Sequence, residues 1–246
     1  MREDLLVMNL ELEGHTVRRY DADLNHCHIR VLELGGIVLQ QFIEALGALQ
    51  KWDVAAARTV IERDEGVRQL EKAVDAELVQ VIAKRTPVAR DLRAVIGMSK
   101  MVADLGRVEE KVVRLAEFTA SVFDEETSNP PDALLKDVTA MGRAALAHLR
   151  QALEIFDRGD AAAAEAGLGA REEFLSWLRS DLRRLTTFMM EDSRLIGQVI
   201  GVVLALSALE RIAEYTVNLR ENVIYQVTGE TLRSPPATRN PVAKAS

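Results

Sequence analysis

The hexapeptide Trp52-Asp53-Val54-Ala55-Ala56-Ala57 resembles a second one 107 residues later, Gly159-Asp160-Ala161-Ala162-Ala163-Ala164. The same offset relates Val31-Leu32-Glu33-Leu34-Gly35 to Val138-Thr139-Ala140-Met141-Gly142. Separate stretches that recur in the same order are typical of a duplicated structural unit, here of roughly a hundred residues. Later matches lie 104 residues apart, as a three-residue deletion in the second copy would cause: Arg107-Val108 with Arg211-Ile212, and Glu117 with Glu221.

Each copy divides into three helical segments. Asp53 and Asp160 are good N-caps, because a short carboxylate accepts hydrogen bonds from the free amides of a first helical turn. Apolar residues recur at the helical period and predict one buried face, as in Leu92, Val95, Ile96, Val102, Leu105, Val108, Val112 and Leu115. The expected helices cover residues 21–50, 53–84 and 88–123 in the first copy, and 132–157, 160–190 and 194–227 in the second.

The predicted fold is all-α: two repeated three-helix bundles in an elongated molecule. Helices of ~30 residues are ~45 Å long at a rise of 1.5 Å per residue. A polar stretch that ends in two prolines separates the copies and is predicted to be a linker. The last residues carry basic but no acidic side chains and few large apolar ones, which predicts disorder. The expected boundaries are an N-terminal extension at 1–20, repeats at 21–123 and 132–230, the linker at 124–131 and a tail at 231–246.

Composition excludes several classes of protein. Of 246 residues, 48% are hydrophobic and 4% aromatic, with only 14 glycines and 6 prolines, whereas β-sandwiches and barrels need many tight turns. The net charge of −7 argues against a dedicated nucleic-acid-binding protein. Cys27 is the only cysteine, so no Cys-based zinc site forms. The longest nearly apolar run, residues 195–209, is shorter than the ~18 residues of a membrane span and predicts a buried helix.

No catalytic residue is expected. The four histidines are His15, His26, His28 and His148, and none has a glutamate three residues before it, as a ferritin-like di-metal site requires. The sequence has no glycine-rich phosphate loop. A Ser-His-Asp constellation cannot be argued from a helical chain with so few histidines.

The end of each copy resembles the PhoU family. Residues 209–221, Leu-Glu-Arg-Ile-Ala-Glu-Tyr-Thr-Val-Asn-Leu-Arg-Glu, are similar to the family's Leu-Glu-Arg-Ile-Gly-Asp-His-Ala-x-Asn-Ile-Ala-Glu. Residues 223–229 then match its Val-Ile-Tyr-x-Val-x-Gly. In the first copy, Pro87-Val88-Ala89-Arg90-Asp91-Leu92-Arg93 resembles the family's Pro-x-Ala-x-Asp-Leu-Arg. The resemblance covers about residues 20–230.

The resemblance implies a cytoplasmic protein of two three-helix bundles, usually in a homodimer. Proteins of this family associate with the phosphate-specific ABC transporter and link it to a sensor histidine kinase. They hold the phosphate-starvation response off when phosphate is plentiful. The implied function is therefore non-enzymatic negative regulation, with the transporter's ATPase subunit and the kinase as partners. Candidate contact residues are Asp91 and Arg93 in the motif of the first copy, Arg211 in that of the second, and Arg107, which ends the stretch 100–107 that follows the first-copy motif.

Carboxylates recur along single helix faces in both copies. The second copy has Glu210, Glu214 and Glu221, and the first has Glu110 and Glu117 at corresponding positions, with Asp64 and Glu71 on the preceding helix. Hard oxygen ligands in such an arrangement can bind a divalent cation or iron. In PhoU proteins the Glu-x-x-x-Asp motif on these helices is a metal site.

The chain departs from that metal motif. Gly106 stands where the first copy needs a glutamate, and Arg68 replaces an acid on the second helix. The second-copy counterparts of Asp64 and Arg68 are Arg171 and Leu175. The spacings of Arg68 and Arg211 to nearby acids also suit ion pairs on a helix surface. We therefore expect at most a weakly bound divalent metal or iron. The alternatives to the regulatory function are a metal-binding protein and a diverged helical interaction module with other partners.

Overall fold

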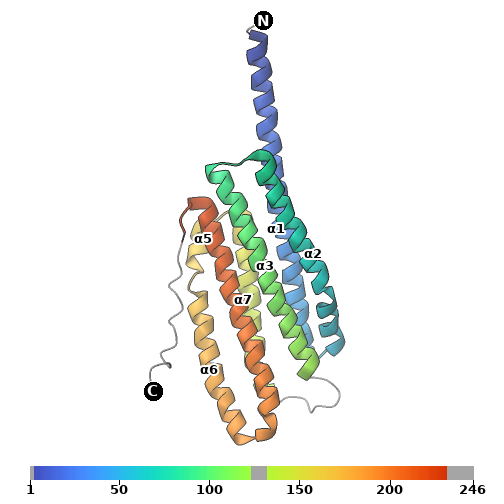
Figure 1. Cartoon of the computed structure of the whole chain (residues 1–246). Coiled ribbons are helices and arrows are strands. Elements are labelled where there is room, and N and C mark those ends of the chain that lie inside the picture. The colour runs from blue at the N-terminus through green and yellow to red at the C-terminus, as the bar shows by residue number, and fades with distance from the viewer. Residues whose placement is uncertain (1–2, 123–131, 232–246) are drawn as a thin grey trace, which may run out of the picture.

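The protein is all-α, as predicted. The computed structural model describes residues 3–122 and 132–231, with side chains at 21–121, 135–192 and 194–231, and these residues contain no β-strand. Their elements are α1 (Glu3–Lys51), α2 (Val54–Arg85), α3 (Ala89–Val122), α4 (Asp132–Arg158), α5 (Ala161–Ala166), α6 (Ala170–Glu191), the short 3₁₀ helix η1 (Ser193–Leu195) and α7 (Ile196–Thr228). Figure 1 shows them running along one long axis.

The third helices of the two repeats form the centre of the molecule. α3 and α7 pack against each other, α1 and α2 pack on α3, and α4, α5 and α6 pack on α7. The first helices of the two repeats, α1 and α4, also pack against each other and form a second contact between the repeats. α1 starts at Glu3, ahead of the predicted start at residue 21, and its first turns extend beyond the other helices (Figure 1).

The predicted caps form in both repeats. The Asp53 carboxylate accepts a hydrogen bond from the Ala56 amide at 2.9 Å, and Asp160 accepts one from the Ala163 amide at 3.0 Å. Each cap therefore satisfies an amide that the first helical turn leaves without a partner. The repeated hexapeptide thus builds the same helix start twice.

The α1–α4 contact repeats about an approximate internal two-fold axis. A Cβ placed on Gly35 of α1 would lie 2.5 Å from Leu153 of α4, and one on Gly142 of α4 would lie 2.6 Å from Leu46 of α1. The two glycines are 107 positions apart, and so are the two leucines. Each glycine therefore leaves the space that the other repeat's leucine fills. The close approach of these two helices depends on residues without a side chain.

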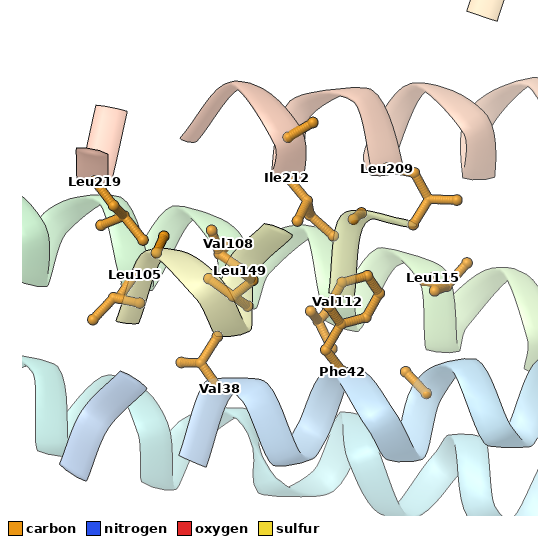
Figure 2. Close-up of a cluster of buried hydrophobic side chains, with 14 of the residues drawn as sticks. Val38, Phe42, Leu105, Val108, Val112, Leu115, Leu149, Leu209, Ile212 and Leu219 are labelled. Atoms are coloured by element: carbon orange, nitrogen blue, oxygen red, sulfur yellow. The ribbon is translucent and has the colours of Figure 1, made fainter. Parts of the chain in front are cut away.

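The two repeats share one hydrophobic core. Figure 2 shows side chains of both halves meeting in it: Val38 and Phe42 from α1, Leu105, Val108, Val112 and Leu115 from α3, Leu149 from α4, and Leu209, Ile212 and Leu219 from α7. The two bundles of the predicted fold are therefore halves of one continuous packing unit.

The helix predicted over residues 160–190 is interrupted. Its two parts, α5 and α6, are separated by Gly167-Leu168-Gly169. The fully buried Arg220 guanidinium packs against the break, where a Cβ on Gly167 would lie 2.2 Å from its Nη1. Arg220 donates hydrogen bonds to the Ala163 carbonyl at 3.3 Å and to Gln151 Oε1 at 2.9 Å. The prediction was wrong here because the arginine that needs this space belongs to α7, far away in the sequence.

Two described stretches, Asp21–Lys51 and Ile196–Thr228, are long and apolar enough to cross a membrane. Half of the apolar window in each is buried inside the bundle, as in the core helices of other helical proteins. Within the run 195–209, Val199, Val202 and Leu206 are fully buried, whereas Ile200 and Leu204 are exposed. The predicted linker at 124–131 and nearly all of the predicted tail, 232–246, lie outside the described residues.

Gly35→Val should lower the free energy of unfolding by about 1–3 kcal/mol, because the new side chain overlaps Leu153 in a packed contact. The matched control is Gly36→Val, since nothing lies within 4 Å of a Cβ at that neighbouring position. Urea unfolding of both variants measures the difference. Equal destabilisation by the two substitutions would show that the α1–α4 contact does not depend on the glycine.

Candidate functional site

The predicted carboxylates belong to α2 and α3 in the first repeat and to α7 in the second. Asp64 and Glu71 belong to α2, and Glu110 and Glu117 to α3. Glu210, Glu214 and Glu221 belong to α7. We call the first group the α2–α3 carboxylate face and the second the α6–α7 carboxylate face.

Arginines neutralise the α6–α7 carboxylate face. Arg171 of α6 donates to Glu214 at 2.6 Å, and Arg211 donates to the other oxygen of the same carboxylate. Arg211 Nε also lies 3.7 Å from Glu210. Burial raises the pKa of Glu210, and Glu214 adds to that rise while Arg211 and Arg171 oppose it. A metal ion at this face would have to displace the guanidinium groups that already hold Glu214.

The α2–α3 carboxylate face has a different arrangement. The buried Asp64 carboxylate pairs with Arg68 one helical turn away. Glu71 packs against Gly106, where a Cβ would lie 2.5 Å from the carboxylate carbon. Burial, followed by the charge of Asp75, raises the pKa of Glu71. The glycine that removes a ligand from the expected metal motif therefore makes room for a carboxylate of the neighbouring helix.

Sequence reasoning missed the most buried acid of this face, Glu109. Its side chain is 2% exposed, and neither carboxylate oxygen has a hydrogen-bond partner. Burial raises its pKa to about 8, and the nearby Asp64 contributes to the shift. The helical period could have located it, because Glu109 lies four residues after Leu105 and three before Val112, on the apolar face of α3.

The other predicted ligands lie apart. Glu110 pairs with Lys111 at 2.9 Å, and this hydrogen bond lowers its pKa. Glu117 pairs with Arg114 at 2.9 Å, and Glu221 is half-buried on α7. Among the residues with described side chains, no three Asp, Glu, His or Cys residues gather closely enough to hold a metal ion. The donor set therefore does not fit a resident metal site.

A polar cluster joins the two repeats at the α3–α7 contact. Asp104 of α3 is 4% exposed and accepts hydrogen bonds from Asn222 and Asn218 of α7. Arg107 donates to the same carboxylate at 2.8 Å, and its guanidinium lies 5.9 Å from the centre of the Tyr215 ring. Burial raises the pKa of Asp104, against the lowering effect of these hydrogen bonds. We call these residues the Asp104 cluster.

The four candidate contact residues all lie on α3 and α7. Arg107 and Arg211 are equally exposed, each with 55% of the side chain accessible. Asp91 is half-buried at the start of α3, where its amide donates to the Val88 carbonyl at 3.1 Å. Arg93, also half-buried, lies against Gly229, which ends α7 in the left-handed conformation. The motif residues thus lie along the pair of helices that joins the repeats.

Two copies of a three-helix unit, joined through their third helices, define a duplicated helical-bundle protein. Comparison with known proteins identifies it further, since the PhoU domain model matches residues 31–119 and 138–223, once in each repeat. The chain belongs to the PhoU family. The resemblance of the sequence motifs is thereby confirmed.

Individual relatives are similar over almost the whole chain. The "Phosphate-specific transport system accessory protein PhoU homolog" of Pseudomonas putida is 35% identical, over 90% of this chain and 86% of its own length. The protein named "Phosphate-specific transport system accessory protein PhoU" in Escherichia coli K12 is 33% identical, over 92% of each chain. The crystal structure of PhoU from Pseudomonas aeruginosa matches with a TM-score of 0.79 and 32% identity, covering 86% of this chain and all of that one.

Because Arg68 and Arg171 pair with the acids, we predict that the fold needs no bound metal. After dialysis against a chelator, helical circular dichroism and the melting temperature should be unchanged, and added Mg²⁺, Mn²⁺ or Fe²⁺ should not raise the melting temperature. Metal analysis before and after dialysis provides the check. Metal that survives the chelator and is lost in Glu210→Ala and Glu214→Ala would contradict this prediction.

Glu109 should make stability depend on pH. Its pKa is about 8 in the folded protein and near 4.5 in the unfolded chain, so the folded state retains a proton that the unfolded state loses. The stability it contributes is complete below pH 4.5 and is lost as the pH rises through about 8. We expect Glu109→Gln to melt higher than the wild type at about pH 9, with the gap closing toward about pH 5.

The matched control is Glu110→Gln, because Glu110 is the neighbouring acid but is exposed and has a lowered pKa. The stability of Glu110→Gln relative to the wild type should not increase as the pH rises. If Glu109→Gln lost stability with pH in parallel with the wild type, the buried carboxyl would not be the titrating group.

Proposed function

We propose that this protein is an accessory protein of a phosphate-specific transport system and that it restrains the phosphate-starvation response when phosphate is plentiful. The observation that supports this most strongly is the similarity to named accessory proteins over about nine-tenths of the chain, with a match in each repeat. The proposed role is non-enzymatic and cytoplasmic, and the protein acts as a homodimer.

Regulation by such a protein works through differential binding. A protein that binds one conformation of a partner more tightly than another shifts the partner toward that conformation. We propose the transporter's ATPase subunit and a sensor histidine kinase as the two partners. The same helical body contacts both, so that the state of the transporter is communicated to the kinase.

The α3–α7 surface is our candidate for these contacts. Arg107 and Arg211 correspond in the two repeats and lie on its exposed side. A carboxylate holds each guanidinium, Asp104 for Arg107 and Glu214 for Arg211. Arginines held in this way lose less conformational entropy on binding than free side chains do, and they suit acidic surfaces of a partner.

Deleting the gene should raise expression of phosphate-starvation genes in phosphate-rich medium, because the restraining protein is lost. A plasmid copy of the wild type should restore repression, whereas Arg107→Glu with Arg211→Glu should restore it poorly. A reporter fused to a starvation promoter measures both effects. The control is Arg63→Glu on α2, because Arg63 has the same 55% side-chain exposure and also pairs with an acid, Glu44.

Co-purification with the ATPase subunit and the kinase tests the partners directly. Both should be retained by the wild type and by Arg63→Glu, and lost with the double variant. Unchanged reporter expression after gene deletion would instead favour an interaction module that has exchanged its partners. Equal loss of binding by Arg63→Glu would move the contact surface away from α3 and α7.

A further inference from the structure

A groove of about 490 Å³ lies between the turn from α1 to α2 and the start of α4. Gln50 and Trp52 line one wall, and Lys136, Thr139 and Arg143 line the other. The indole of Trp52 is 38% exposed. No acidic residue lines the groove. Its volume falls within the range of sites that bind small molecules.

Trp52 occupies a backbone conformation that suits glycine. Its φ is 60°, in the left-handed region, and the corresponding residue of the second repeat, Gly159, has a φ of 63°. The turns are otherwise alike: the next residue, Asp53 or Asp160, donates its amide to the carbonyl of Ala48 or Ile155. A bulky side chain is strained at such a position. The first repeat therefore carries a tryptophan where its backbone would be more stable with glycine, which points to a role for the indole.

The opposite wall presents two cations without carboxylate partners. Lys136 and Arg143 are exposed and form no ion pair within the described part of the chain. Lys136, Thr139 and Arg143 are spaced i, i+3 and i+7, so they lie on one face of α4.

The internal two-fold pairs the turn from α4 to α5 with α1 at the equivalent place, and the residues there lack these features. Ile29 and Gly36 stand at the positions of Lys136 and Arg143, and Glu33 replaces Ala140. Gly159 stands at the position of Trp52. The strained Trp52 backbone and the unpaired cations therefore occur together, in only one of two structurally equivalent places. Duplication alone does not account for that combination.

We propose that this groove binds a nucleoside phosphate. The base stacks on the Trp52 indole, and the phosphate oxygens lie between Lys136 and Arg143. An indole offers a flat face to a purine ring, and ammonium and guanidinium groups bind phosphate by charge-assisted hydrogen bonds. Thr139, between the two cations, supplies a hydroxyl donor. The proposal is independent of the transporter and kinase contacts, since no residue of the groove belongs to α3 or α7.

Isothermal titration calorimetry of the full-length chain with ADP tests the site. ADP should bind with one-to-one stoichiometry, and pyrophosphate and adenosine should each bind at least about tenfold more weakly, because each lacks half of the recognised groups. Pyrophosphate binding as tightly as ADP would overturn the assignment of a nucleoside phosphate. Failure of ADP to bind would overturn the site altogether.

Three variants locate the binding. Lys136→Gln with Arg143→Gln should weaken ADP binding by about tenfold or more, whereas Arg150→Gln, an exposed arginine of α4 outside the groove, should leave it unchanged. Trp52→Gly should also weaken binding while melting at the same temperature as the wild type or higher, as the Gly159 turn indicates. Unchanged ADP affinity in Trp52→Gly, or equal weakening by Arg150→Gln, would contradict the proposal.

Discussion

The antiparallel packing of α3 against α7 is the contact on which the rest of the molecule depends. The two helices belong to different repeats. Their contact therefore buries apolar surface that a separate three-helix unit would leave exposed to water. The Asp104 cluster lies within this contact, and its amide donors come from the opposite repeat. A buried carboxylate without those donors would be costly, so the cluster favours one register of the two helices.

The two carboxylate faces carry different charges at equivalent positions. Asp64 in the first repeat corresponds to Arg171 in the second, and each pairs with a group of opposite sign. Opposite charges that neutralise each other locally leave few ligands for a cation. Asp64 is therefore held in an ion pair within α2, and Glu214 in one between α6 and α7. Glu109 is the exception, because it is buried beside Asp64 without a partner and retains its proton instead.

Differences between the repeats are as informative as their similarity. The turns at Trp52 and Gly159 have the same backbone path, yet only one carries a side chain that its conformation disfavours. The second helices of the two repeats differ too. α2 runs unbroken over 32 residues, whereas its counterpart is divided into α5 and α6 at Gly167, where Arg220 occupies the space. Residues that disturb an otherwise duplicated structure indicate where the two halves have acquired separate roles.

The sequence by itself determined the all-α class, the duplication, the helix caps at Asp53 and Asp160, and the family, because these depend on residues close together in the chain. It also predicted which acids share a helix face, since that follows from the helical period. Only the tertiary structure decided what those acids face. Arg171 pairs with Glu214, Glu71 fills the space left by Gly106, and Arg220 packs where α5 and α6 are separated. Each of these contacts joins residues from different elements. A local pattern cannot predict such contacts, because the packing of the whole bundle determines which side chains meet.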